Sequence, residues 1–209
     1  MQTPSLGLYV LASLALIATP GQDMMYVVSR ALAQGRRAGV LSAIGVCLGI
    51  LVHTALAALG VGAILQASEA LFLALKLAGA AYLAWLGARM ILKRGAAAAL
   101  EPAGDARAAA TLVWQGMVSN VTNAKIVLFF FAFLPQFVDP ASAHATRDLI
   151  ALGVLYAALA LPVKGAVALL AGTFSDRVLR RPRAIAWMNR ACGVAMLALA
   201  ARLAADERR

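Results

Sequence analysis

Six long apolar runs, separated by short polar segments, dominate the hydrophobic pattern of this chain. An α-helix that crosses the hydrocarbon core of a bilayer takes about 20 mainly apolar residues, and each run is of that order. The sixth run is the weakest, because its uncharged core extends only from Ala191 to Ala201. The pattern predicts an all-α integral membrane protein with spans at Leu6–Val28, Ala38–Leu65, Leu71–Leu92, Leu112–Leu134, Leu149–Thr173 and Ala184–Leu203.

Polar segments interrupt the first and the fourth run near their middle. The first break is Thr19-Pro20-Gly21-Gln22-Asp23, and the second runs from Asn120 through Asn123 to Lys125. Polar groups at this depth are costly and usually functional. Interrupted apolar segments at matching places in two halves indicate a transporter with a binding site near the midplane. The residues that we expect to take part in substrate binding are Thr19, Pro20, Gly21, Gln22, Asp23, Asn120, Asn123 and Lys125, together with Lys164 of the fifth run.

The segment between spans three and four divides the chain into halves. Residues 95–110 are rich in alanine and carry charges of both signs. We predict a cytoplasmic linker there, with a first repeat at 1–94 and a second at 111–209, all within one transmembrane domain of residues 1–209. Because each half holds three spans, related halves would have inverted topologies. This inverted repeat is inferred from the layout, since no convincing residue identity links the halves.

Each break has the form of a half-helix that starts inside the membrane. In the first, Thr19 would be the N-cap, Pro20 would take the first helical position and Gln22 would complete a capping box. In the second, Asn123 would be the N-cap and Lys125 would lie in the first turn. Two helix N-termini that face one cavity offer N–H groups and partial positive charge to a carboxylate. The alternative for the first break is a simple kink.

Charged side chains near the breaks suit a zwitterionic substrate. Lys125 would add a positive charge for a carboxylate, or would only bond to a backbone carbonyl. Asp23 would hold an ammonium group, or would be an ordinary residue at the membrane interface. Asp23 and His53 are candidates for proton coupling, although His53 could simply bond between helices. Lys164 on span five is either a second cation of the cavity or a side chain that snorkels to the membrane surface.

The composition excludes an ordinary soluble domain, since 63% of the residues are hydrophobic and 13% are charged, with a mean hydropathy of +0.83. The formal net charge of +10 would favour nucleic acid in a soluble protein, but the basic residues gather in the loops after spans one, three and five, among them Arg30, Arg36 and Arg37. By the positive-inside rule these loops are cytoplasmic and both termini face outward. The pair Arg208-Arg209 goes against this orientation. The expected partner is the lipid bilayer, and no nucleic acid.

Residues for other chemistries are scarce in the spans. Cys47 and Cys192 are isolated, and a free Cys in an apolar helix usually packs as a small hydrophobe. The chain has no G-x-x-x-x-G-K-[ST] motif for ATP binding. We therefore expect no metal, no cofactor and no enzymatic activity. A metal-ion exporter and a thiol-disulfide carrier of the same architecture are the alternatives to a transporter of organic solutes.

Several motifs in sequence order resemble the LysE/RhtB family of amino-acid exporters. They are Thr19-Pro20-Gly21 with Asp23, Gly35–Gly39, Leu75–Leu83, Asn120–Lys125, and Phe129–Phe131 followed by Leu134–Phe137. The resemblance covers nearly the whole chain, and span six matches least. Gln22 and Ala124 stand where the family pattern has proline. Without these prolines the two breaks are expected to be less rigid.

The resemblance implies a multi-pass protein of the bacterial inner membrane that exports amino acids or close derivatives. It also implies proton antiport and a homodimer, with a neutral amino acid, homoserine or its lactone as the expected substrate. By motif position, the membrane-buried elements of the family correspond here to Pro20, Gly21, Asp23, Asn120, Asn123 and Lys125.

Overall fold

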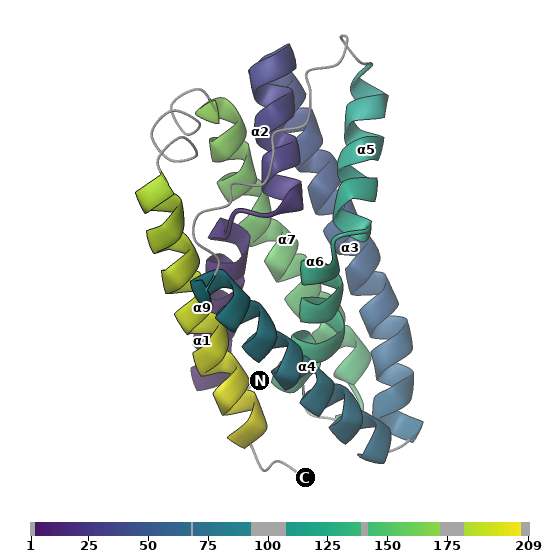
Figure 1. The fold of residues 1–209 in the computed structure, drawn as a ribbon. Coiled ribbons are helices and arrows are strands. Elements are labelled where there is room, and N and C mark those ends of the chain that lie inside the picture. The colour runs from purple at the N-terminus through teal and green to yellow at the C-terminus, as the bar shows by residue number, and fades with distance from the viewer. Residues whose placement is uncertain (1–2, 68, 93–107, 139–141, 172–181, 206–209) are drawn as a thin grey trace.

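The computed structural model describes residues 3–67, 69–92, 108–138, 142–171 and 182–205, and every element within these ranges is a helix (Figure 1). The predicted linker lies outside the described residues, apart from its last three positions. The helices are α1 (Thr3–Ala18), α2 (Gln22–Gln34), α3 (Arg36–Ala67), α4 (Glu69–Leu92), α5 (Ala109–Val121), α6 (Ala124–Leu128), the π-helix η1 (Phe129–Phe133), the 3-10 helix η2 (Leu134–Phe137), α7 (Ala145–Leu169) and α9 (Pro182–Ala205).

Both predicted interruptions are present in the structure. Helices α1 and α2 meet at a bend of 50°, and α5 meets the segment Ala124–Phe137 at a bend of 55°. Two further helices, Arg36–Gly60 within α3 and all of α7, are long and apolar enough to cross a membrane unbroken. Among the described residues this gives up to four candidate spans. The all-α membrane fold is therefore confirmed, while the six-span count and the inverted repeat stay predictions.

The helices form one bundle around the two bends. Figure 1 shows that α1 begins and α9 ends at the same end of the bundle, as an even number of crossings would require. Helix α3 packs against both α5 and α7, and α4 packs mainly against α9. In Figure 1, α4 runs obliquely across the front of the other helices. The long helices α3 and α7 thus support the broken ones.

Glycines let α3 and α5 approach closely. A Cβ atom added at Gly49 would lie 2.7 Å from the Cβ atom of Asn120, and one added at Gly116 would lie 2.5 Å from the carbonyl oxygen of Ser42. Small residues at helix contacts have this role in membrane proteins. The contact brings the second break against α3.

Aromatic rings fill the core on the α1 side of the bends. Phe129 lies 5.1 Å from Tyr156 and 4.9 Å from Phe133, measured between ring centroids. Tyr9 joins this cluster, and its hydroxyl donates to the carbonyl of Leu152 at 2.7 Å. These contacts tie α1 and the segment after α6 to α7, and so hold the two breaks in place.

Candidate functional site

The first break differs from the predicted capping box. Gly21, not Thr19, is the N-cap of α2, and no side chain caps this helix end. The Thr19 hydroxyl instead donates to the carbonyl of Ala15 at 2.7 Å. Pro20 precedes the N-cap, and Gln22 is exposed. The capping box was a wrong prediction, because a hydroxyl at the end of a helix can also be satisfied by the carbonyl four residues earlier.

The second break matches its prediction. Asn123 is the N-cap of α6, and its Oδ1 accepts a hydrogen bond from the backbone N–H of Lys125 at 3.1 Å. The Nδ2 of the same side chain donates to Asp23 Oδ1 at 3.0 Å. Since Asp23 lies in the first turn of α2, Asn123 joins the N-terminal ends of the two half-helices directly.

Asp23 and Lys164 form a buried ion pair. The distance from Lys164 Nζ to Asp23 Oδ2 is 2.8 Å, and the two side chains are 3% and 1% exposed. Both side chains are thus enclosed within the bundle, and Lys164 pairs with Asp23 instead of reaching the surface. Each carboxylate oxygen of Asp23 has its own donor, which is the arrangement a buried charge needs.

Lys125 closes the end of α1. Its Nζ donates to the carbonyls of Leu16 and Thr19 at 3.2 and 3.3 Å, where the last carbonyls of a helix lack partners and carry partial negative charge. A Cβ atom on Gly21 would lie 3.0 Å from this ammonium group. The bonding to backbone carbonyls that the sequence left open is therefore present. The charge of Lys125 also acts on Asp23.

Asn120 and His53 form a second polar group beside the first. His53 Nε2 lies 3.3 Å from the carbonyl oxygen of Asn120, which also accepts the N–H of Asn123 at 2.9 Å. A carbonyl can only accept, so Nε2 carries the hydrogen. Among the described residues, His53 Nδ1 and both side-chain amide atoms of Asn120 are buried without a hydrogen-bond partner. His53 is thus connected to the Asp23 cluster through the backbone of the break.

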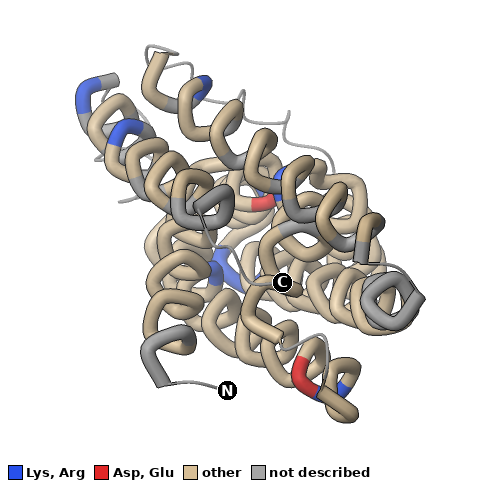
Figure 2. Tube along the Cα trace, turned by 90° about the horizontal axis from the view of Figure 1, so that it is seen from below, with Lys and Arg blue, Asp and Glu red and all other residues tan. Residues whose placement is uncertain are grey.

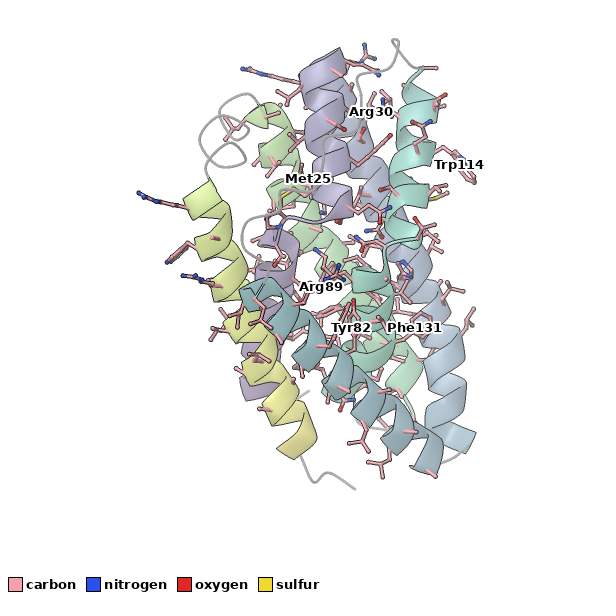
Figure 3. All side chains as sticks on the ribbon, viewed as in Figure 1. Met25, Arg30, Tyr82, Arg89, Trp114 and Phe131 are labelled. Carbon is pink, nitrogen blue, oxygen red and sulfur yellow. The ribbon has the colours of Figure 1, made fainter. Side chains whose placement is uncertain are left out.

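Arg30 is a buried residue that the sequence interpretation missed, because it was counted as a loop charge. It lies in α2 with 4% exposure, and its guanidinium group lies 5.2 Å from the ring centroid of Tyr26. Arg30 follows Asp23 by seven residues, so both lie on one face of α2, about 10 Å apart along its axis. Figure 3 shows Arg30 within the bundle, whereas Trp114 on α5 points away from it. The helical spacing from Asp23 was the signal available in the sequence.

The interior is therefore charged at a few defined points. Figure 2, which looks at the bundle from below, shows acidic and basic positions among helices that are otherwise uncharged. One carboxylate and two ammonium groups meet at the bends, together with the N-terminal ends of α2 and α6. This set can exchange ionic partners with a small zwitterion. Within the described residues, no three His, Cys, Asp or Glu side chains are placed to hold a metal ion.

A hollow of about 300 Å³ opens at the far ends of α2 and α7. It is lined by Ala31, Leu32, Gly35, Arg36, Leu169, Leu170 and Ala171. Helices α2 and α7 are also the two helices that carry the ion pair. Ala31 is eight residues beyond Asp23, and Leu169 is five beyond Lys164, which correspond to about 12 and 8 Å along the helices. The hollow therefore lies one to two turns from the pair.

Known proteins resemble this chain over most of its length. A leucine efflux protein of Enterobacter sp. (strain 638) is 29% identical over 201 residues, which are 94% of this chain and 93% of that protein. A homoserine/homoserine lactone efflux protein of Salmonella typhimurium is 30% identical over 196 residues, or 94% of each chain. An uncharacterized membrane protein of Pseudomonas aeruginosa is 37% identical over 163 residues, which are 73% of this chain and 74% of that protein. No solved structure gave a significant match.

The family assignment rests on a match that covers nearly the whole chain. The model of the LysE type translocator family matches residues 14–207, which include both breaks and Lys164. The resemblance noted from the motifs is thereby confirmed. The chain belongs to the LysE type translocator family, a family of all-α membrane transporters.

Proposed function

We propose that this protein is a secondary exporter of amino acids or close derivatives, with its substrate site where the two breaks meet. The observation that carries the proposal is the Asp23 carboxylate, which is 1% exposed and bonded to Asn123 and Lys164. A buried carboxylate held by exchangeable donors suits an ammonium group. The efflux proteins of leucine and of homoserine and its lactone among the relatives support the same class of substrate.

The substrate would be held by both of its charged groups. Its ammonium group binds at Asp23, and its carboxylate faces the N-terminal ends of α2 and α6, with Lys125 nearby. Thr19, Pro20, Gly21 and Gln22 would contribute mainly through the backbone of the first break. A neutral side chain is expected, since Asp23 is the acidic group within the cluster and is already used by the ammonium group. Leucine, homoserine and homoserine lactone are the first candidates.

The proposed coupling is proton antiport in the bacterial inner membrane. Asp23 is the coupling site, because a proton or a protonated group competes there with the ammonium group of the substrate. His53 is the second candidate for proton coupling, although it lies in the neighbouring polar group with Asn120. The basic end of the bundle near Arg36 and Arg37 would be cytoplasmic, and both termini periplasmic. A homodimer is part of the same proposal.

The two alternative functions have little support from the described residues. A metal-ion exporter would need a cluster of metal ligands. A thiol-disulfide carrier would need a pair of reactive thiols that face one cavity. Cys47 is buried with a free thiol, and the side chain of Cys192 lies outside the described residues. The double variant Cys47→Ser, Cys192→Ser should transport at the wild-type rate, and loss of transport would favour the redox function.

The experiment uses proteoliposomes that are loaded with radiolabelled L-leucine or homoserine lactone. We expect wild-type protein to release at least one of them when an inward proton gradient is imposed, and an uncoupler to slow this release. Asp23→Asn should abolish it, because the amide cannot neutralise an ammonium group. Arg147→Gln is the matched control, since its side chain is 73% exposed. Full proton-driven release by the Asp23→Asn variant would contradict the proposed site.

A further inference from the structure

The partner of Asp23 within the protein has the same chemistry as part of the proposed substrate. Lys164 holds a primary ammonium group 2.8 Å from Asp23 Oδ2, and an amino acid also carries a primary ammonium group. Both side chains are nearly inaccessible, at 3% and 1% exposure. The ammonium group of a substrate can therefore reach Asp23 Oδ2 only if Lys164 gives up its place.

Lys164 lies two residues after a proline inside α7. Pro162, inside α7, lacks the N–H that would bond to the carbonyl four residues earlier, which loosens the helix at this turn. A Cβ atom added at Gly165 would meet no atom within 4 Å. Lys164 is thus next to a weakened turn and to a loosely packed glycine of α7, and movement of this turn would withdraw its side chain from Asp23.

A displaced Lys164 has few ways to keep its charge. Among the described residues, the charged and titratable groups around Lys164 are Asp23 on α2, Lys125 at the second break, Cys47 on α3 and Tyr156 on α7. Only Asp23 carries a negative charge among these, and the ammonium group of the substrate would occupy it. The carboxylate of the substrate would in turn face Lys125 and the N-terminal ends of α2 and α6, as proposed above. An ammonium group without a counterion is unfavourable inside a membrane, whereas lysine can give its proton to water and remain as a neutral amine. The hollow between the ends of α2 and α7 brings solvent to within one to two helical turns.

We infer that Lys164 carries the coupled proton across the membrane. The inference rests on the proposed function and goes beyond it, because it places the proton on a lysine amine and not on Asp23 or His53. Substrate binding from the cytoplasm displaces Lys164, which releases one proton to that side. After the substrate leaves on the outer side, the amine takes up one proton there and pairs again with Asp23. The unloaded protein then returns to its inward-facing state with the Asp23 carboxylate neutralised by the Lys164 ammonium group. One proton therefore moves inward for each substrate exported.

Two variants of Lys164 separate proton transport from a structural role. Lys164→Met removes the proton-carrying group but keeps a side chain of similar length. Lys164→Arg keeps the ion pair with Asp23 but holds its proton permanently. Gel filtration and thermal unfolding in detergent show whether each variant is folded, and the arginine variant preserves the charge pair if the methionine variant is unstable.

The assay compares two modes of L-leucine transport in proteoliposomes. Net efflux into leucine-free buffer requires the return of the unloaded protein, whereas exchange against external leucine does not. A pH-sensitive dye reports proton movement in the opposite direction. We expect Lys164→Met to lose about ten-fold or more in net efflux and its proton movement, and to keep exchange within about three-fold of wild type. Lys164→Arg should be folded and should not support proton-driven efflux.

Three results would overturn this assignment. Proton-driven efflux by the methionine variant would show that the proton travels elsewhere, and so would efflux by the arginine variant. Equal loss of exchange and efflux in a folded methionine variant would make Lys164 a binding residue only. A wild-type protein that exchanges neither leucine nor homoserine lactone would refute the proposed function itself, and this result is distinct because it does not depend on any variant.

Discussion

The buried pair of Asp23 and Lys164 should be the most sensitive electrostatic contact in the protein. Replacement of Lys164 by methionine leaves a carboxylate that is 1% exposed without the cation 2.8 Å away. Replacement of Asp23 by asparagine leaves the ammonium group in the same position, although the new side chain can still accept from Asn123. Each single variant therefore removes the nearest counterion of a buried charge, and the double variant removes both charges of the pair.

The structure sets the size of the effect. At 2.8 Å, two unit charges attract each other by about 6 kcal/mol with an effective dielectric constant of about 20. Desolvation of the two ions offsets most of this attraction, so the intact pair adds little net stability. Loss of one partner leaves the other charge desolvated without its attraction, and should lower the free energy of unfolding by about 3–5 kcal/mol. The double variant should cost much less than the two single variants together.

Equilibrium unfolding in mixed micelles of dodecyl maltoside and SDS measures these free energies. Arg147→Gln serves as the control, because Arg147 is 73% exposed and lies 3.8 Å from Asp148; its loss should change the free energy of unfolding by about 0–1 kcal/mol. The reasoning is refuted if the single variants unfold like the control, or if their costs simply add in the double variant.

Three further predictions concern the surroundings of this pair. Asn123→Ala removes both the N-cap of α6 and a donor to Asp23, so it should cost about 1–3 kcal/mol in unfolding and slow leucine exchange, whereas unchanged values would show that the bridge between the half-helices is dispensable. Gly49→Ala should cost about 1–3 kcal/mol in the same unfolding assay, because the new Cβ atom would lie 2.7 Å from that of Asn120. Gly165→Ala should be neutral, because a Cβ atom at that position meets no atom within 4 Å. Similar values for both variants would contradict the close helix contact. His53→Gln keeps an N–H donor for the carbonyl of Asn120 and should retain proton-driven efflux within about three-fold, whereas its selective loss would move the coupling role to His53.

The pattern of apolar and polar residues was sufficient to predict the membrane fold and the two breaks. The position of each break follows from polar residues that no lipid-facing helix would carry, and the N-cap role of Asn123 follows from local chemistry alone. These features depend on contacts within a few residues. They can therefore be inferred from the sequence without knowledge of the packing.

The ion pair could not be inferred in the same way. Asp23 and Lys164 are 141 residues apart in sequence. Lys164 follows a proline in a helix, and the local sequence does not determine how deep this helix position lies in the membrane. Burial of a long basic side chain and snorkelling to the surface are equally consistent with that local pattern. Only the packing of α2 against α7 decides between them.

Two local interpretations failed, each for a different reason. The Thr19 hydroxyl could cap α2 or bond back to Ala15, and the sequence does not reveal that the back-bonded geometry is adopted. Arg30 was assigned to a loop because the predicted first span ends at Val28, whereas α2 extends to Gln34. A bend allows a broken span to be longer than a straight one, which places more residues inside the bundle.

The most direct test of the account is a structure of the wild-type protein determined with saturating L-leucine. The account predicts that the leucine ammonium group lies within hydrogen-bond distance of Asp23 and that Lys164 Nζ has moved away from Asp23 Oδ2. Leucine bound elsewhere, with the pair between Asp23 and Lys164 still intact, would contradict it.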